Sequence, residues 1–220
     1  MTPIQQLFLG VGVAEKTYLD EIFSIDAWAG TNSDKTITNG IDLSTEGGLV
    51  MIKTRGPNSF HWALADTERG TNKILKSDNA DEQGTVYETL KAYNTNGYNL
   101  GGAAQVNWRT GGGTSDEHVG YTFRKAPGFF DCIKYTGGGE SSSSPKTISH
   151  SLGSVPGMII CKQMTDAWTN WFVYHKVLGE DKFMILNTTG AANNYNGGFK
   201  NITSRSEERR VGKECRSRWS

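Results

Sequence analysis

The chain has 220 residues, with 27 glycines, 5 prolines and 3 cysteines, and its 23 basic and 23 acidic residues give a formal net charge of zero. This balance excludes a strongly basic protein that binds nucleic acid chiefly through phosphate contacts. Three cysteines are too few for a disulfide framework, and the length allows one sizeable hydrophobic core or two small ones.

The chain begins with a short apolar segment, Ile4 to Val13, which contains Gln5 and Gln6 and follows no basic leader. It is shorter than a membrane-spanning helix, and without a basic leader it lacks the form of a signal peptide. We therefore expect no membrane partner. Residues 1–20 are interpreted as an N-terminal leader, either an attachment segment or a flexible terminus.

From residue 21 onward, short runs of β-branched, aromatic and aliphatic residues alternate with clusters of Gly, Asn, Ser and Asp, which is the pattern of strands and turns. The candidate strands are Ile22–Trp28, Gly48–Lys53, Phe60–Ala65, Thr71–Leu75, Tyr121–Arg124, Phe130–Tyr135, Met158–Lys162, Trp171–His175 and Lys182–Leu186. One segment, Thr85–Tyr93, fits a helical face or a pair of strands equally well. The pattern predicts an all-β fold built of tandem β-sandwich or jelly-roll units, which are lectin-like in form.

An internal repeat divides the chain. Residues 47–55 (GGLVMIKTR) are similar to residues 156–164 (PGMIICKQM), and a shift of 109 also aligns Leu43 with Leu152, Trp62 with Trp171 and Gly70 with Gly179. Upstream, residues 22–30 match residues 129–137 at a shift of 107. The repeat predicts a first unit over residues 21–127 and a second over residues 128–204. The second unit is expected to be incomplete, because it lacks a counterpart of residues 117–128 (EHVGYTFRKAPG).

The last sixteen residues, 205–220, differ in composition from the rest of the chain. Six are basic and three acidic, so the remaining 204 residues hold 17 basic and 20 acidic side chains, a formal charge of about −3. The string RSEERRVGKECRSRWS resembles one reading frame of a common sequencing adapter. We therefore interpret it as an artefactual, disordered tail rather than a basic nucleic-acid-binding arm.

Several motifs resemble a domain of unknown function that occurs in tandem in tail-fibre and other virion proteins of marine phages. These motifs are YTGGGE, KTISHSLGSVPGMIICK and WFVYH, with EKTYLDEIF, TNGIDLSTEGGLVMIK and YTFRKAPGFFD before them. The resemblance covers nearly all of residues 1–204. It implies a virion tail protein that is assembled in the host cytoplasm and has a concanavalin A-like, lectin-like sandwich. The partners it implies are other virion proteins, further copies of the chain in a homo-oligomeric fibre, and a host surface carbohydrate.

One carboxylate pair could support catalysis. Asp66 and Glu68 are two residues apart and would lie on one side of a strand, like the acid and the nucleophile of a sandwich-fold glycosidase. The second unit has His175 and Val177 at these positions, which favours a salt-bridged turn instead. We expect no enzymatic activity, and a glycan hydrolase or depolymerase using Asp66 and Glu68 is the alternative.

Neither a metal nor a cofactor is expected. The four histidines, His61, His118, His150 and His175, show no metal-ligand spacing, and Cys132 and Cys161 lie in apolar runs typical of buried thiols.

Aromatic residues supply the candidate ligand site. Trp62 and Trp171 recur in both units, which favours a core role for both. Surface aromatics that stack on a sugar are better sought at the positions that do not recur, which are Trp28, Tyr98, Trp108 and Trp168. The candidate ligand-binding residues are Asn107, Trp108, Arg109 and Asp116, beside the loop TGGGTSDE. The alternative is that these are partly buried loop residues.

These observations together predict a non-enzymatic phage virion or tail-fibre structural protein that binds host surface glycans, with avidity from many copies compensating for weak single sites.

Overall fold

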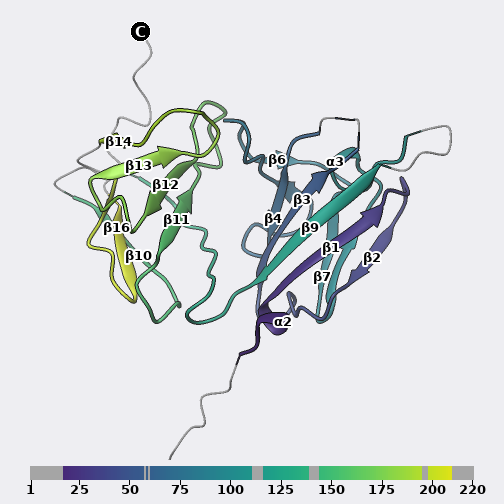
Figure 1. The fold of residues 1–220 in the computed structure, drawn as a ribbon, viewed down its shortest axis with the longest axis horizontal. Coiled ribbons are helices and arrows are strands. Elements are labelled where there is room, and N and C mark those ends of the chain that lie inside the picture. Colours follow the sequence, from purple (N-terminus) through teal and green to yellow (C-terminus); the bar gives the residue numbers. More distant parts are fainter. Residues whose placement is uncertain are drawn as a thin grey trace, which may run out of the picture.

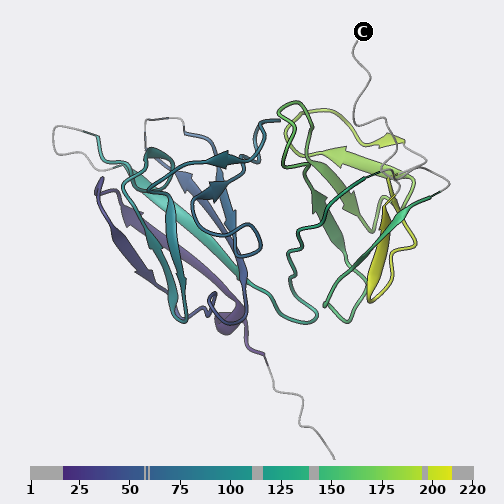
Figure 2. The same ribbon diagram turned by 180° about the vertical axis from the view of Figure 1, so that it is seen from behind.

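The computed structural model describes residues 17–56, 58, 60–110, 116–138, 144–194 and 198–209. The fold is nearly all β, with several antiparallel sheets, which confirms the predicted class. Figures 1 and 2 show two lobes side by side. We call residues 17–127 the amino-terminal lobe and residues 128–209 the carboxy-terminal lobe.

The amino-terminal lobe is a sandwich of two sheets. The larger sheet has the order β1 (Phe23–Ala29), β9 (Glu117–Arg124), β3 (Gly48–Thr54) and β4 (Ala63–Asp66). The smaller sheet has the order β2 (Lys35–Thr38), β8 (Gly97–Leu100) and β7 (Leu90–Asn94). A short pair, β5 (Lys73–Ile74) with β6 (Gly84–Thr85), and two single-turn helices, α2 (Leu19–Ile22) and α3 (Ala104–Asn107), complete the lobe.

The core of this lobe lies between the two sheets because their strands alternate. Along β3 every second residue is buried, so Val50 and Ile52 face inward while Leu49 and Met51 face the outer side. Tyr98 and Leu100 of β8 meet them from the smaller sheet and are fully buried. Each such aliphatic side chain contributes roughly 1.5–3 kcal/mol to stability.

The carboxy-terminal lobe repeats this pairing scheme in part. Its smaller sheet has the order β10 (Lys146–Ser149), β16 (Ser206–Arg209) and β15 (Phe199–Lys200), which matches β2, β8 and β7. Its larger sheet has the order β11 (Met158–Cys161), β12 (Phe172–His175), β13 (Lys182–Ile185) and β14 (Asn193–Asn194). Strands β3, β4 and β5 correspond to β11, β12 and β13 at the shift of 109.

One expectation needs correction. Phe130–Tyr135 forms no strand, although its counterpart β1 does. The physical reason lies in the partner: β1 pairs with β9 alone, and the described part of the carboxy-terminal lobe contains no counterpart of β9. Of the two alternatives for Thr85–Tyr93, the structure shows the strands: the segment runs from β6 through a turn into β7.

The tail expected to be disordered begins with an ordered part. Ser206–Arg209 form β16 and pair with β10, while residues 210–220 lie outside the described residues. The artefactual origin of residues 205–220 stays a prediction. Of the expected leader, residues 1–16 also lie outside the described residues. In the part of the chain that the structure describes, no helix has the length and apolarity to cross a membrane.

Candidate functional site

Asn107, the first residue of the predicted ligand patch, is fully buried. Its Nδ2 donates to Thr31 Oγ1 at 2.9 Å and to the Ser33 carbonyl oxygen at 2.5 Å, and its Oδ1 accepts from the Thr31 N–H at 3.1 Å. An amide used in this way holds the loop after β1 against α3. Asn107 therefore does not offer its side chain to a ligand, which corrects the prediction.

Asp116 is also buried, with only 1% of its surface exposed. Its Oδ2 accepts from Asn58 Nδ2 at 2.9 Å and from Thr110 Oγ1 at 2.7 Å, while its Oδ1 has no hydrogen-bond partner among the described residues. Residues 111–115 of the predicted ligand loop lie outside the described residues. Among the described residues Asp116 ties Asn58 to Thr110, and a ligand-binding role for it stays a prediction.

Trp108 and Arg109 reach the surface. Trp108 is half-buried with its ring edge against Phe60, at a centroid distance of 6.2 Å. Arg109 is exposed, and its backbone N–H and carbonyl are both bonded to the side chain of Asn32, at 2.6 and 2.8 Å. A ligand-binding role for Trp108 and Arg109 stays a prediction.

The other aromatic residues proposed for sugar stacking differ in how much of each side chain is exposed. Trp28 and Tyr98 are core residues, 7% and 0% exposed, so they cannot stack on a ligand. The reason is local: Trp28 Nε1 donates to the Val106 carbonyl at 3.2 Å, which draws the indole into the sandwich. Trp168 is 87% exposed and remains available.

The carboxylates of the alternative catalytic pair both lie in ion pairs. Asp66 accepts from Arg69 Nε at 2.5 Å and from the Arg69 N–H at 2.9 Å, forming a closed turn after β4. Glu68 Oε1 lies 3.0 Å from Lys125 Nζ. The Arg69 side chain is only 4% exposed, which makes the turn a structural element. Nothing in this geometry favours a hydrolase.

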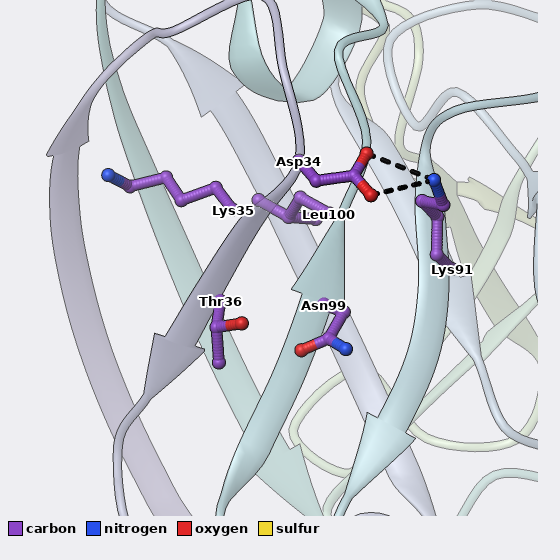
Figure 3. A pocket seen from close by; sticks show the side chains of 6 residues that line it. All are labelled: Asp34, Lys35, Thr36, Lys91, Asn99 and Leu100. Atoms are coloured by element: carbon purple, nitrogen blue, oxygen red, sulfur yellow. Dashed lines mark hydrogen bonds and ion pairs between the residues drawn. The ribbon is translucent and has the colours of Figure 1, made fainter.

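A polar groove of about 200 Å³ lies on the amino-terminal lobe, and its residues were not predicted. It is lined by Asp34, Lys35, Thr36, Lys91, Asn99 and Leu100 (Figure 3). These residues are scattered over 67 positions of the sequence, and only strand pairing brings them together. The feature of the sequence that could have indicated this groove is the alternation of polar and apolar residues in Lys35–Thr38.

The side chain of Lys91 is held in the groove by hydrogen bonds to two carboxylates. Its Nζ lies 2.9 and 3.0 Å from the two carboxylate oxygens of Asp34 and 3.1 Å from Glu88 Oε2. These hydrogen bonds, chiefly the one to Asp34, raise the pKa of Lys91. A register shift between Leu90 and Ala92 places Lys91 in a β-bulge, a feature that re-aims side chains.

Thr36 and Asn99 form the floor of the groove as a cross-strand pair. Asn99 Oδ1 accepts from Asn94 Nδ2 at 2.9 Å, which fixes the orientation of the amide. In Figure 3 the two side chains lie next to each other on adjacent strands, while the ammonium group of Lys35 points away from the Asp34–Lys91 pair. The groove thus offers a hydroxyl, an amide and a carboxylate close together.

The two lobes meet through Trp171. Its indole packs with Leu64 and Leu75 in a buried cluster, and Leu49, Met51, Trp62 and Met164 pack around it. The indole is 5% exposed, and its Nε1 donates to the Lys76 carbonyl oxygen at 2.8 Å. Trp171 is buried, as expected, but it packs in the interface between the lobes and not in the core of its own unit. Trp62 is half-buried and contacts Tyr121 on the outer face of its own sheet.

Main-chain groups complete this lobe contact. The Gln83 N–H donates to the Met164 carbonyl at 2.8 Å, and Lys162 Nζ reaches the Ala80 carbonyl at 3.3 Å. Burial at this interface lowers the pKa of Lys162. A second hollow of about 390 Å³ lies at the junction, between residues 74–86 of one lobe and Ala167 of the other.

Thiols and imidazoles do not form a metal centre in the described residues, where no three His, Cys, Asp or Glu side chains converge. Cys132 and Cys161 are both half-buried, and the Cys161 thiol lies 3.5 Å from the Tyr135 hydroxyl. His118 is buried between Thr54 and the Trp108 carbonyl, at 3.3 and 3.2 Å, and burial lowers its pKa.

Comparison with known proteins gives one match. The family model described as "Domain of unknown function (DUF7483)" matches residues 20–218, which include both lobes. No curated protein matches the chain. No solved structure matches it either.

Proposed function

The chain belongs to the DUF7483 family of domains of unknown function, and from that premise we propose that it is a non-enzymatic structural protein of a phage virion or tail fibre. The phage setting rests on the sequence motifs described above. The structural role rests on the lobe contact, in which Trp171 is buried against Leu64 and Leu75 of the other lobe. Such a contact favours a rigid two-lobed spacer.

The partners of this role are other virion proteins and further copies of the chain in an oligomeric fibre, assembled in the host cytoplasm. Purified virions of a phage that encodes the chain should contain it, which mass spectrometry of the particles would detect. Its absence from particles that are otherwise complete would exclude the role.

The rigidity of the spacer has its own test. Trp171→Ala should loosen the lobes and raise the radius of gyration measured by small-angle X-ray scattering, while Trp168→Ala, which removes an 87% exposed indole three residues away, should not. An equal effect of both substitutions, or of neither, would contradict a spacer held by Trp171.

A second function, binding of host surface glycans, is supported by the polar groove. Asp34 supplies an acceptor, Thr36 and Asn99 supply donors, and neighbouring hydroxyls of a pyranose need both kinds of partner. The volume of about 200 Å³ suits a single sugar residue. Because no aromatic residue lines the groove, we expect weak binding at a single site, with dissociation constants of about 1 mM. Multiple copies of the chain would increase the apparent affinity.

Titration of the full chain with methyl glycosides of neutral hexoses tests this function. Amide resonances of Thr36, Lys91 and Asn99 should shift, and Asn99→Ala should abolish the shifts. Thr38→Ala, at an exposed position of β2 outside the groove, should not. Unchanged binding by Asn99→Ala would remove the groove from consideration.

A further inference from the structure

The hollow of about 390 Å³ at the junction of the lobes, which we call the junction hollow, has walls from both lobes. The amino-terminal lobe supplies residues of β5, of the loop over residues 76–83, of β6 and of α3, and the carboxy-terminal lobe supplies Ala167. In Figure 1, β6 lies on the side of the amino-terminal lobe that faces the other lobe. Pockets of about 300–1,000 Å³ at such junctions are typical sites for small ligands. The size and the place of this hollow are therefore those of a binding site.

Hydrogen bonds hold the walls of the junction hollow in place. The Gln83 N–H donates to the Met164 carbonyl oxygen at 2.8 Å, which ties the two lobes together at one edge of the hollow. Lys162 Nζ donates to the carbonyl oxygens of Ala80 and Asp166, at 3.3 and 3.4 Å, and so joins the same two segments a second time. Because the walls are fixed without a ligand, a ligand would not have to order them on binding.

The walls of the junction hollow combine apolar and polar side chains. Ile74, Val86 and Ala167 line it with aliphatic surface. Glu82 and Gln105 add a carboxylate, which accepts hydrogen bonds, and an amide, which both accepts and donates them. A sugar ring has the same two characters, because its C–H groups form apolar faces and its hydroxyls need both acceptors and donors. The hollow thus offers partners for both parts of a sugar.

The charges in the wall disfavour an anionic ligand. Lys76 lines the hollow, but its Nζ is 2.6 Å from Asp81 Oδ2, so its charge is already paired. This hydrogen bond holds the pKa of Asp81 below its ordinary value, so Asp81 stays ionised. Glu82 adds a second carboxylate to the wall. Repulsion between like charges therefore favours a neutral sugar over one that carries a carboxylate or a phosphate.

An exposed indole stands beside the junction hollow. Trp168 is 87% exposed and directly follows Ala167. Consecutive Cα atoms are about 3.8 Å apart, so this indole is attached at the rim of the hollow. Its backbone is fixed, because the Trp168 N–H donates to Asp166 Oδ1 at 3.0 Å and the next residue, Thr169, is buried. At the shift of 109 the first unit has Ser59 at this position, so the repeated fold does not require a tryptophan here. A flat ring at the rim of a hollow is suited to stacking on a sugar.

We propose, on the basis of the glycan binding proposed above, that the junction hollow holds one residue of a neutral glycan. The apolar face of its ring lies against Trp168 and the aliphatic wall, and its hydroxyls bond to Glu82 and Gln105. This site shares no residue with the groove that contains Asn99. The two sites can therefore be tested separately in one titration.

The probes are methyl glycosides of neutral hexoses, titrated into the full chain while its amide and indole N–H resonances are followed. The amides of Gly84 and Ala167 and the indole N–H of Trp168 should shift. Trp168→Ala should raise the dissociation constant at the hollow about tenfold, because it removes the stacking surface. Trp168→Phe keeps an aromatic ring and should raise it less than about threefold. Methyl glucuronide, which carries a carboxylate, should bind about fivefold more weakly than methyl glucoside.

Asn99→Ala is the matched control, because it removes a groove residue and should leave the shifts of Gly84 and Ala167 unchanged. Undiminished shifts of these two amides in Trp168→Ala, or equal affinity for glucuronide and glucoside, would overturn the proposal. If the groove amides of Thr36 and Asn99 shift while those of Gly84 and Ala167 do not, glycan binding stands and the junction site fails. The absence of shifts at both places would overturn both.

Discussion

The imidazole of His118 lies nearly parallel to the indole of Trp28, with ring centroids 5.7 Å apart and an interplanar angle of 13°. The two residues are cross-strand partners on β1 and β9, neighbouring strands of the larger sheet. Both ring nitrogens of His118 are used inside the protein, by Thr54 and by the Trp108 carbonyl. The site is therefore built for a neutral imidazole.

Stability should fall in mild acid because of His118. Burial lowers its folded pKa, so below about pH 6.5 the unfolded chain takes up a proton that the folded chain resists. The stabilisation is fully present above this pH and is lost as the pH falls toward the folded pKa. Urea unfolding between pH 7.5 and 5 measures the slope, and His118→Gln should flatten it. The same slope in both proteins would show that another group is responsible.

Asn107→Ala should destabilise the amino-terminal lobe by about 2–4 kcal/mol, because it removes the buried amide that donates to the Ser33 and Gly101 carbonyls and to the Thr31 hydroxyl. Arg109→Ala, at an exposed neighbouring position, should change stability by less than about 0.5 kcal/mol. Chemical denaturation of both variants makes the comparison. A mild effect of Asn107→Ala would restore the residue as a candidate ligand contact.

Asp66→Asn should cost about 3 kcal/mol, because the guanidinium of Arg69 would remain buried without its counter-charge. Glu68→Gln breaks a more exposed ion pair with Lys125 and should cost about 0.5 kcal/mol. Thermal unfolding distinguishes the two. If both variants unfold like the wild type, the closed turn is not the role of these carboxylates.

Replacing the repeated glycine by alanine should have opposite effects on stability in the two lobes. Gly48→Ala should destabilise by more than about 3 kcal/mol, since the added methyl collides with the Phe123 backbone. Gly157→Ala meets no such obstacle and should stabilise slightly, by about 0.5 kcal/mol. Calorimetry of the two variants decides this. Equal destabilisation would mean that Gly157 is as closely packed as Gly48.

Cys132 should resist alkylation in the folded protein. Burial raises the pKa of its thiol to about 12, which reduces the thiolate at pH 8 by about a thousandfold relative to an exposed cysteine. Iodoacetamide labelling with peptide mapping, in buffer and in denaturant, provides the measurement. Comparable rates in the two conditions would contradict a buried thiol.

The sequence predicted the fold class well because alternation and glycine-rich turns are local signals. It located β1, β3, β4, β5, β9, β11, β12 and β13, most of which belong to apolar runs. It missed β2 and β8, whose outward residues Thr36 and Asn99 are polar. It overpredicted Phe130–Tyr135, because a strand-like composition does not supply a partner strand.

The candidate site was harder to predict, for a physical reason. Asn107 and Trp28 look like surface residues in sequence, and only the fold reveals the carbonyls that draw them inward. The groove of Asp34, Lys91 and Asn99 depends on a β-bulge and on strand register, neither of which leaves a local pattern.

Two hydrogen bonds of the contact between the lobes join side chains of the carboxy-terminal lobe to carbonyl oxygens of the amino-terminal lobe. Trp171 and Lys162 reach the main chain at Lys76 and Ala80, so the identities of the residues there matter little. Among relatives of this chain, the sequence of the loop over residues 76–83 should therefore vary. Trp171 and Lys162, whose side chains bond to its carbonyl oxygens, should be retained. Evolutionary constraint on these two hydrogen bonds is expected to be one-sided.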